Sequence, residues 1–311
     1  RSMNNLASSY TALGRHAEAL KIHGETLELR KARLGRDHPD TLQSMNNLAN
    51  SYGHLARHAD AFKLREETLA LRKAKLGPAP PNTLISMHHL ATSYAALGRQ
   101  ADALKLNEET LALRKAKLGP DHPDTLMSMN NLANSYAALG RHVQALQLRE
   151  ETLAMKKLKL GLEHPDTLMS MNNVANSYAT LGRHVQALQL REETLSLMKV
   201  KLGPDHPETL QNMFNVAVSY AALGRHAAAL KLREETLALQ KAKLGLDHPK
   251  TLSSMWAVAE SLVELDRDAE AVPIIDECLQ RAAGKVVDPR MIPIVVELRL
   301  RHFEKAKDAA G

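Results

Sequence analysis

A period of 42 residues runs through almost the whole chain of 311 residues. Seven methionines and six glycines keep this spacing, and segments 125–166 and 167–208 are identical at 33 of 42 positions. A period of this length, sustained over so many copies, predicts a solenoid in which each unit packs only against its neighbours. All six tyrosines also follow the period: Tyr10, Tyr52, Tyr94, Tyr136, Tyr178 and Tyr220.

Each unit is predicted to contain two helices. In the fourth unit, Asp121 is expected to cap the first helix, and Pro123 to occupy its first turn, where the missing N–H costs little. Apolar residues then recur at spacings of three and four until Gly140, which is typical of a helix C-terminus. A second amphipathic helix is expected from about His142 to Gly161.

Composition narrows the choice of fold and compartment. Aromatic residues make up 3 % of the chain and there is one cysteine, Cys278. These values favour helices packed closely through small residues over a β-sandwich, and they exclude a disulfide framework. The formal charge of +6 comes from 41 basic and 35 acidic residues that alternate within each repeat, so a nucleic-acid interface is not expected. Without a membrane span or signal peptide, a cytoplasmic protein is predicted, with no membrane partner.

One repeated segment resembles a known family. It contains Met-Asn-Asn-Leu-Ala-Asn-Ser-Tyr at 129–136, Leu-Gly-Arg at 139–141, Ala-Leu at 145–146, Gly161 and His-Pro-Asp at 164–166. This pattern resembles the tetratricopeptide repeat (TPR) in the 42-residue form of kinesin light chains, and it recurs from residue 1 to about 283. The resemblance implies an all-α, right-handed α-solenoid of about seven helix-turn-helix units. It also implies a concave groove lined by the first helices, binding of proteins or peptides, and no catalysis.

The period divides the chain into a TPR array, 1–286, and a C-terminal capping helix and tail, 287–311. The first unit lacks the start of its first helix, so the chain reads as a fragment of a longer protein. In the seventh unit, Pro273 is expected to kink the second helix or shift its start. Residues 298–305 resemble the ends of TPR arrays carried by bacterial serine/threonine kinases. The expected units are 1–40, 41–82, 83–124, 125–166, 167–208, 209–250 and 251–286.

Two positions of each first helix, four residues apart, align with the groove positions of the family. Asparagine dominates the middle units, and an amide can bond a peptide N–H or C=O without reading a side chain. The last two units carry Phe214 and Trp256, so the groove is predicted to become apolar there; packing against the divergent seventh unit and the cap is the alternative for both. Solvated polarity is the alternative for the amides. The predicted groove residues are Asn46, Asn50, His88, Thr92, Asn130, Asn134, Asn172, Asn176, Phe214, Val218, Trp256 and Glu260.

The remaining polar residues are interpreted as structural. Ten of the fifteen histidines occupy two repeat positions, far from ligand spacing, so no metal site and no cofactor are expected. Runs such as Arg149-Glu150-Glu151 suggest ion pairs between helices rather than acid–base catalysis. Arg65, Arg149, Arg191 and Arg233 fall at a helix interface, where pairing with Glu is one option left open. Ala56 replaces a helix-ending glycine, and 78–82 replaces the Asp-His-Pro turn, so any local fraying is expected in units two and three.

The leading hypothesis is a non-enzymatic module that binds an extended peptide or partner segment in the concave groove. One alternative is the sensor or docking arm of a larger signalling protein, such as a serine/threonine kinase or a nucleotide-switch ATPase. Another is a self-assembling scaffold. We expect a monomer, with end-to-end association at the truncated N-terminal edge as the alternative.

Overall fold

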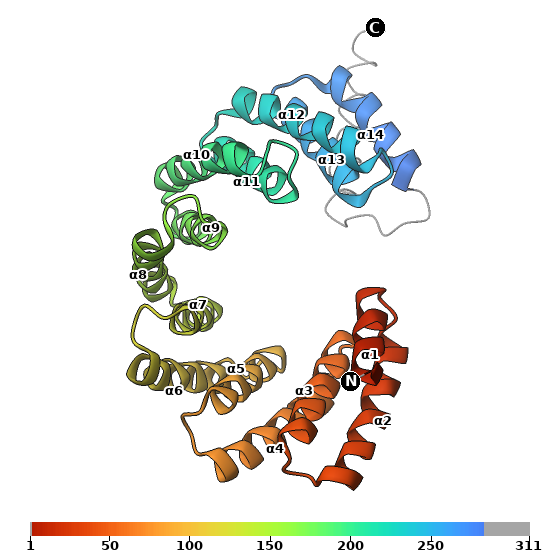
Figure 1. Cartoon of the computed structure of the whole chain (residues 1–311). Helices are drawn as coiled ribbons and strands as arrows, with labels where there is room; N and C mark the ends of the chain where they lie inside the picture. The colour runs from red at the N-terminus through yellow and green to blue at the C-terminus, as the bar shows by residue number, and fades with distance from the viewer. Residues whose placement is uncertain (1, 283–311) are drawn as a thin grey trace, which may run out of the picture. The chain divides into compact units, whose positions relative to one another are not determined.

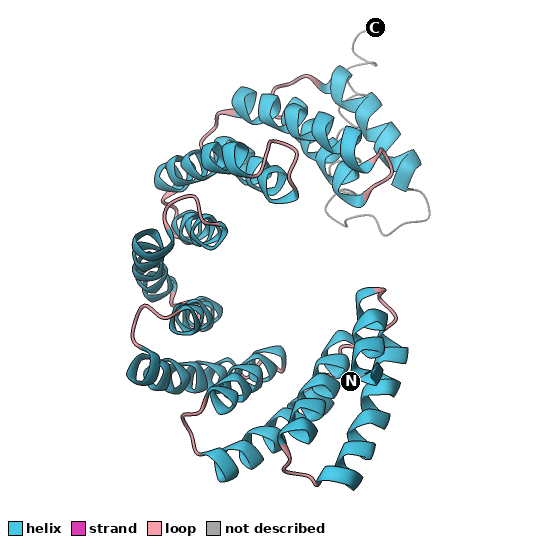
Figure 2. Cartoon of the chain, viewed as in Figure 1, coloured by secondary structure: helices cyan, strands magenta, loops and turns pink. Residues whose placement is uncertain are grey.

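A computed structural model describes residues 2–282, and helices are the only regular elements in that range (Figures 1 and 2). They alternate between a first and a second helix of each repeat, as the sequence predicts. The first helices are α1 (Ser2–Ala12), α3 (Pro39–His54), α5 (Pro81–Ala96), α7 (Pro123–Ala138), α9 (Pro165–Thr180), α11 (Pro207–Ala222) and α13 (Pro249–Val263). The second helices are α2 (His16–Leu34), α4 (His58–Leu76), α6 (Gln100–Leu118), α8 (His142–Leu160), α10 (His184–Lys201), α12 (His226–Leu244) and α14 (Asp268–Ala282). The predicted capping helix and the kinase-like tail segment lie outside the described residues.

The chain divides into two compact units, an N-terminal unit of residues 1–155 and a C-terminal unit of residues 156–311. In the N-terminal unit, each helix from α1 to α7 packs against the next one along the chain. In the C-terminal unit, the same holds from α9 to α14. Packing between sequence neighbours alone is the arrangement of an α-solenoid, so the predicted fold class is confirmed.

Five of the described first helices begin at a proline that follows a histidine cap. In α7, His122 is the N-cap, and its Nδ1 accepts a hydrogen bond of 3.1 Å from the backbone N–H of Asp124. The expectation that Asp121 caps this helix is therefore wrong. The extended backbone of His122 places its imidazole over the free amides of the first turn. Equivalent histidines cap α3, α9, α11 and α13, whereas Pro80 at the start of α5 makes no side-chain cap.

The same helices end in a turn that requires a left-handed residue. At the end of α7, Gly140 has φ +73°, its N–H bonds the carbonyl of Ala137, and the N–H of Arg141 bonds the carbonyl of Tyr136. This is the Schellman arrangement, in which glycine avoids the clash of a Cβ atom. In the second repeat Ala56 adopts the same conformation with φ +56°, so it carries the strain that the sequence predicts.

Replacing Ala56 with glycine is expected to raise the free energy of unfolding by about 1 kcal/mol, because the left-handed conformation no longer strains a Cβ atom. Urea unfolding followed by circular dichroism measures this change. Gly98→Ala, at the equivalent turn of the third repeat, should lower stability by a similar amount. A destabilised Ala56→Gly variant would contradict this account of the turn.

The core is built in layers between consecutive repeats. One layer joins Leu69 of α4 and Leu106 of α6 to Leu84, Met87 and Leu90 of α5. The methionine at this position is fully buried in six repeats, which explains its strict spacing. The last helix, α14, begins at Asp268, in register with the other second helices, and continues through Pro273. The start of this helix is therefore not shifted by the proline.

Ion pairs connect neighbouring second helices along their exposed side. Lys73 of α4 lies 3.1 Å from Glu109 of α6, and Lys199 of α10 lies 2.8 Å from Glu235 of α12. Glu151 lies 3.8 Å from Lys115 in the same way. The Arg-Glu-Glu runs thus supply inter-helix pairs, as predicted. Such exposed pairs contribute little stability individually.

Candidate functional site

The first helices of consecutive repeats form one face of each unit, called the first-helix face below. At the second predicted groove position of each helix, four side chains are exposed asparagine or threonine, and Val218 is 40 % exposed. The first position lies deeper, because Asn46 is only 3 % exposed and its counterparts are half-buried. The exposed polar residues are Asn50, Thr92, Asn134 and Asn176, and the half-buried counterparts of Asn46 are His88, Asn130, Asn172, Phe214 and Trp256.

Each exposed asparagine is held by an arginine of the same repeat. The Oδ1 atom of Asn50 accepts a hydrogen bond of 2.9 Å from Arg65, and that of Asn134 accepts one of 2.8 Å from Arg149. Asn176 accepts one of 2.7 Å from Arg191. The carbonyl end of each amide is therefore engaged, which orients the Nδ2 donor group away from the arginine. The face presents oriented N–H donors at these points.

The arginines that hold these amides lie between repeats, where Arg65 and Arg149 are half-buried and Arg191 is buried. Arg65 donates to the Oγ of Ser93 at 2.7 Å and to the backbone carbonyl of His89 at 3.2 Å, both on the next first helix. Burial lowers the pKa of Arg65 from its ordinary value, although a guanidinium stays protonated at neutral pH. Pairing with Glu, the option left open by the sequence, occurs at Arg233, which lies 2.9 Å from Glu260.

A second buried row lies seven residues further along the second helices. Arg72 donates to the backbone carbonyl of Asn82 at 2.7 Å and to the Oγ of Ser86 at 2.8 Å. Arg30 and Arg114 make the same two contacts with the helices that follow them. In these three repeats the arginine joins its repeat to the next through hydrogen bonds from a charged donor, which are the stronger kind.

Several of the deeper groove positions bond to a neighbouring first helix. The Nδ1 atom of His88 lies 3.0 Å from Nδ2 of Asn131, and Asn172 accepts a hydrogen bond of 2.7 Å from Asn212. The Oδ1 atom of Asn46 is buried without a hydrogen-bond partner in the described residues. The first groove position of these helices therefore contributes to contacts between repeats as well as to the first-helix face.

The third repeat carries a half-buried histidine, His89, at a position where the neighbouring repeats have asparagine. Burial, and then the charges of His88, Arg65 and Arg72, lower the pKa of His89 to about 4. The unfolded chain has an ordinary histidine pKa near 6.5, so it binds the proton more strongly than the folded chain. Stability from the neutral imidazole is complete above about pH 6.5 and is lost as the pH falls towards 4.

His89→Asn installs the asparagine that stands at 47, 131 and 173. The variant should show a weaker dependence of the free energy of unfolding on pH. Urea unfolding at pH 7 and pH 4.5 measures the effect. We expect the native chain to lose about 2 kcal/mol more than the variant between these values, after allowance for partial exposure of the imidazole. Equal losses would show that His89 does not stay neutral in the folded chain.

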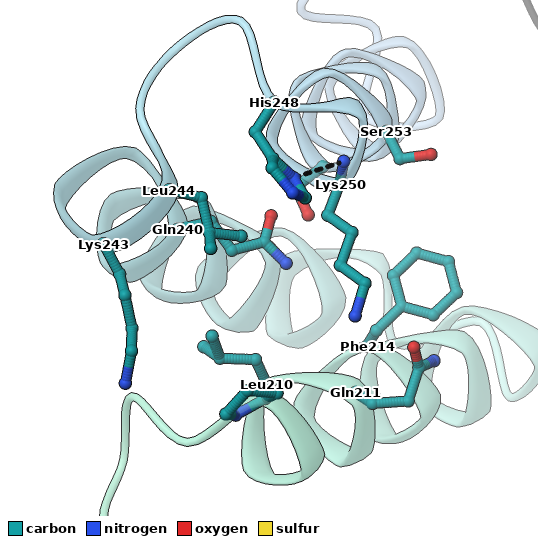
Figure 3. A pocket seen from close by; sticks show the side chains of 11 residues that line it. Leu210, Gln211, Phe214, Gln240, Lys243, Leu244, His248, Lys250 and Ser253 are labelled. Carbon is teal, nitrogen blue, oxygen red and sulfur yellow. Dashed lines mark hydrogen bonds between the residues drawn. The ribbon is translucent and has the colours of Figure 1, made fainter. Parts of the chain in front are cut away.

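The apolar end of the predicted groove divides into two environments. Trp256 packs against the last core cluster, beside Val263, Ile274 and Leu279, which fits the packing alternative considered for it. Phe214 instead lines a pocket of about 320 Å³ between α11, α12 and α13. In Figure 3 the side chain of Lys250 lies between Gln240 and Phe214 in this pocket.

The chemistry of the Phe214 pocket combines an aromatic ring, a cation and an unused acceptor. Gln240 is 6 % exposed, and its Oε1 is buried without a hydrogen-bond partner in the described residues. A donor group could pair with this oxygen, while Lys250 would favour an acidic group beside it.

A second pocket opens on the first-helix face of the N-terminal unit. It has a volume of about 390 Å³ and lies between α5, α6 and α7. The predicted groove residues His88, Thr92 and Asn134 line it, together with Asn107 of α6. The structure therefore brings these three predicted residues together around a polar cavity.

A family model of the tetratricopeptide repeat matches residues 1–74, 46–116, 82–157, 166–242 and 212–283. The chain belongs to the tetratricopeptide repeat family. Kinesin light chain-like TPR repeats from Podosopora anserina are 31 % identical, with a TM-score of 0.62 over 67 % of this chain and 98 % of that one. No curated protein matches the sequence.

Two less similar structures share the fold of this TPR array. BtubC from P. vanneervenii is 19 % identical, with a TM-score of 0.62 over 76 % of this chain and 94 % of that chain. A signal transduction ATPase with a TPR sensor, from Pyrococcus horikoshii, is 15 % identical with a TM-score of 0.68. It covers 98 % of this chain, which matches 43 % of the ATPase.

The TPR pattern missed three residues that line the two pockets: Asn107 and Gln240 on second helices, and Lys250 in the first turn of α13. Asn107 lines the first-helix pocket, and Gln240 and Lys250 line the other. Asn107 did leave a signal in the sequence, because it interrupts a row of arginines. In the described part of this TPR array, no group of three or more His, Cys, Asp or Glu side chains could hold a metal ion. Among the described helices, none is long and apolar enough to cross a membrane.

Proposed function

We propose that this chain is a non-catalytic protein-interaction module whose first-helix face binds an extended peptide or partner segment. The observation that carries the proposal is the tethering of exposed asparagines to arginines that lie between repeats. Because Arg65 fixes Oδ1 of Asn50, and Arg149 fixes that of Asn134, each Nδ2 group is oriented before a ligand arrives. Pre-oriented donors cost less conformational entropy on binding than free side chains.

An extended peptide suits donors placed at intervals of one or two repeats. Its backbone carbonyls are acceptors that carry no side-chain information, so asparagine donors would hold the strand, and pockets would select side chains. The pocket beside Thr92 provides such a selective element in the N-terminal unit, and the pocket beside Phe214 provides one in the C-terminal unit. A cytoplasmic location for this module is consistent with a single, buried cysteine.

A display library of random 12-residue peptides tests the proposal without a known ligand. Peptides selected on the full chain would be synthesised and their affinities measured by fluorescence anisotropy. We expect enriched peptides that compete with one another and bind with micromolar affinity, as is common when a disordered ligand must be ordered. Failure to enrich any peptide above a library passed over the unfolded chain would overturn the proposal.

A further inference from the structure

Asn107 interrupts a row of arginines along the second helices. The equivalent residues of α4, α8, α10 and α12 are Arg65, Arg149, Arg191 and Arg233. Asparagine has a shorter side chain with one amide in place of a guanidinium. The interruption therefore removes a buried cation at one step between repeats.

The neighbouring arginines define what a guanidinium contacts at this position. Arg191 donates from Nη1 to the backbone carbonyl of Asn215 at 3.0 Å and to the Oγ of Ser219. From Nη2 it donates to Oδ1 of Asn176 at 2.7 Å. Arg65 makes the equivalent three contacts in the second repeat. A carbonyl, a serine and a residue of its own first helix thus surround each of these guanidinium groups.

The same acceptors remain around Asn107. They are the carbonyl of Asn131, the Oγ of Ser135 and, in place of the usual asparagine, the hydroxyl of Thr92. The Nδ2 atom of Asn107 reaches Ser135 at 2.9 Å, and the hydroxyl of Ser135 bonds the carbonyl of Asn131 at 3.3 Å. Because both Asn107 and Thr92 are shorter than the usual pair, space is left where the guanidinium would lie.

The pocket of about 390 Å³ described above occupies this space, and Asn107, Ser135, Asn131 and Thr92 all line it. Thr92 and Asn134 are exposed on the first-helix face, so a ligand can enter from that side. Burial, with the charges of Arg114 and Arg65, lowers the pKa of His88, so its ring adds no positive charge at neutral pH. The cavity combines hydrogen-bond acceptors with a neutral wall.

We propose that this pocket receives the guanidinium group of an arginine side chain carried by the bound peptide, at the place where other repeats hold their own arginine. This specificity rests on the peptide-binding function proposed above. The array already accommodates guanidinium groups in successive repeats, since Arg191 and Arg233 occupy equivalent positions of neighbouring repeats. The planar group can donate to all three acceptors, whereas an ammonium offers a single point of attachment.

N-methylguanidine is the direct probe, and NMR of the full chain with ¹⁵N only in asparagine is the readout. We expect saturable shifts of the Asn131 and Asn134 side-chain amides. Binding of N-methylurea, the neutral isostere, should be about tenfold weaker because its hydrogen bonds are not charge-assisted. Asn107→Arg should remain folded, since it installs the residue of four other repeats, and should abolish these shifts by filling the pocket.

The guanidinium site would be overturned by equal shifts in Asn107→Arg, or by N-methylurea binding as tightly as N-methylguanidine. Absence of any saturable shift would also overturn it. The peptide selection separates this inference from the proposed function. If the enriched peptides show no preference for arginine and the chain does not bind N-methylguanidine, the proposed peptide-binding function stands and the guanidinium site is refuted. Binding of N-methylguanidine without any enriched peptide would retain the site and remove the peptide-binding function.

Discussion

Arg72→Ala is expected to lower the free energy of unfolding by about 3 kcal/mol, as measured by urea unfolding with circular dichroism. The side chain is 4 % exposed, and it holds Asn82 and Ser86 of the next repeat. Truncation leaves a cavity of several methylene groups and removes two hydrogen bonds from a charged donor. Removal of a desolvated charge offsets part of this loss, because burial already disfavours the ionised form and lowers the pKa of Arg72.

The chain supplies its own control for this prediction. In the fifth repeat Met198 stands at the position of Arg72, and Asn212 at that of Ser86. Asn212 donates a hydrogen bond to Oδ1 of Asn172. Asn46 is the counterpart of Asn172 in the second repeat, and its Oδ1 atom is buried without a hydrogen-bond partner in the described residues. Arg72→Met with Ser86→Asn should therefore fill the volume and satisfy Asn46, and restore stability to within about 1 kcal/mol of the native chain. A double variant as unstable as Arg72→Ala would contradict this account of the row.

Asn50→Asp with Asn134→Asp is expected to weaken binding of selected peptides by about 100-fold, which is about tenfold for each donor lost. Aspartate has the shape of asparagine and still accepts the hydrogen bond from Arg65 or Arg149. It lacks the N–H groups that would meet a peptide carbonyl, and it places a negative charge there instead. Fluorescence anisotropy with the selected peptides measures the change.

The stability of this variant separates binding from folding. Because each new carboxylate lies beside a half-buried arginine, the free energy of unfolding should stay equal or rise slightly. Asn47→Asp, at the half-buried asparagine that follows Asn46, serves as a control for added charge. Unchanged peptide affinity in the Asn50/Asn134 variant would show that the oriented N–H donors are not part of the binding surface.

The helices could be predicted from sequence because local rules determine their ends. Proline in the first turn and glycine after the last turn act within a few residues, so the expected boundaries of α7 and α8 match the structure closely. The cap of α7 was misassigned because Asp121 and His122 are adjacent and both can accept a hydrogen bond. Backbone geometry decides between them, and it selects His122.

The contacts of the candidate site depend on distances between repeats, which sequence spacing does not contain. The exposed positions of Asn50, Asn134 and Asn176 follow from helical periodicity. Their tethering to arginines fifteen residues further along the chain does not, because it requires the packing angle of two helices. Asn107 was visible as a departure from the repeat, but the cavity beside it depends on three helices at once.

The central claim is that the first-helix face binds an extended peptide through asparagine N–H donors that arginines between the repeats hold in place. A crystal structure of the full chain with a selected peptide tests it most directly. The account predicts peptide carbonyl oxygens within about 3 Å of Nδ2 of Asn50 and Asn134, with Oδ1 still bonded to Arg65 and Arg149. A peptide seated on the outer side of the second helices, or asparagines that leave their arginines to bind it, would contradict the account.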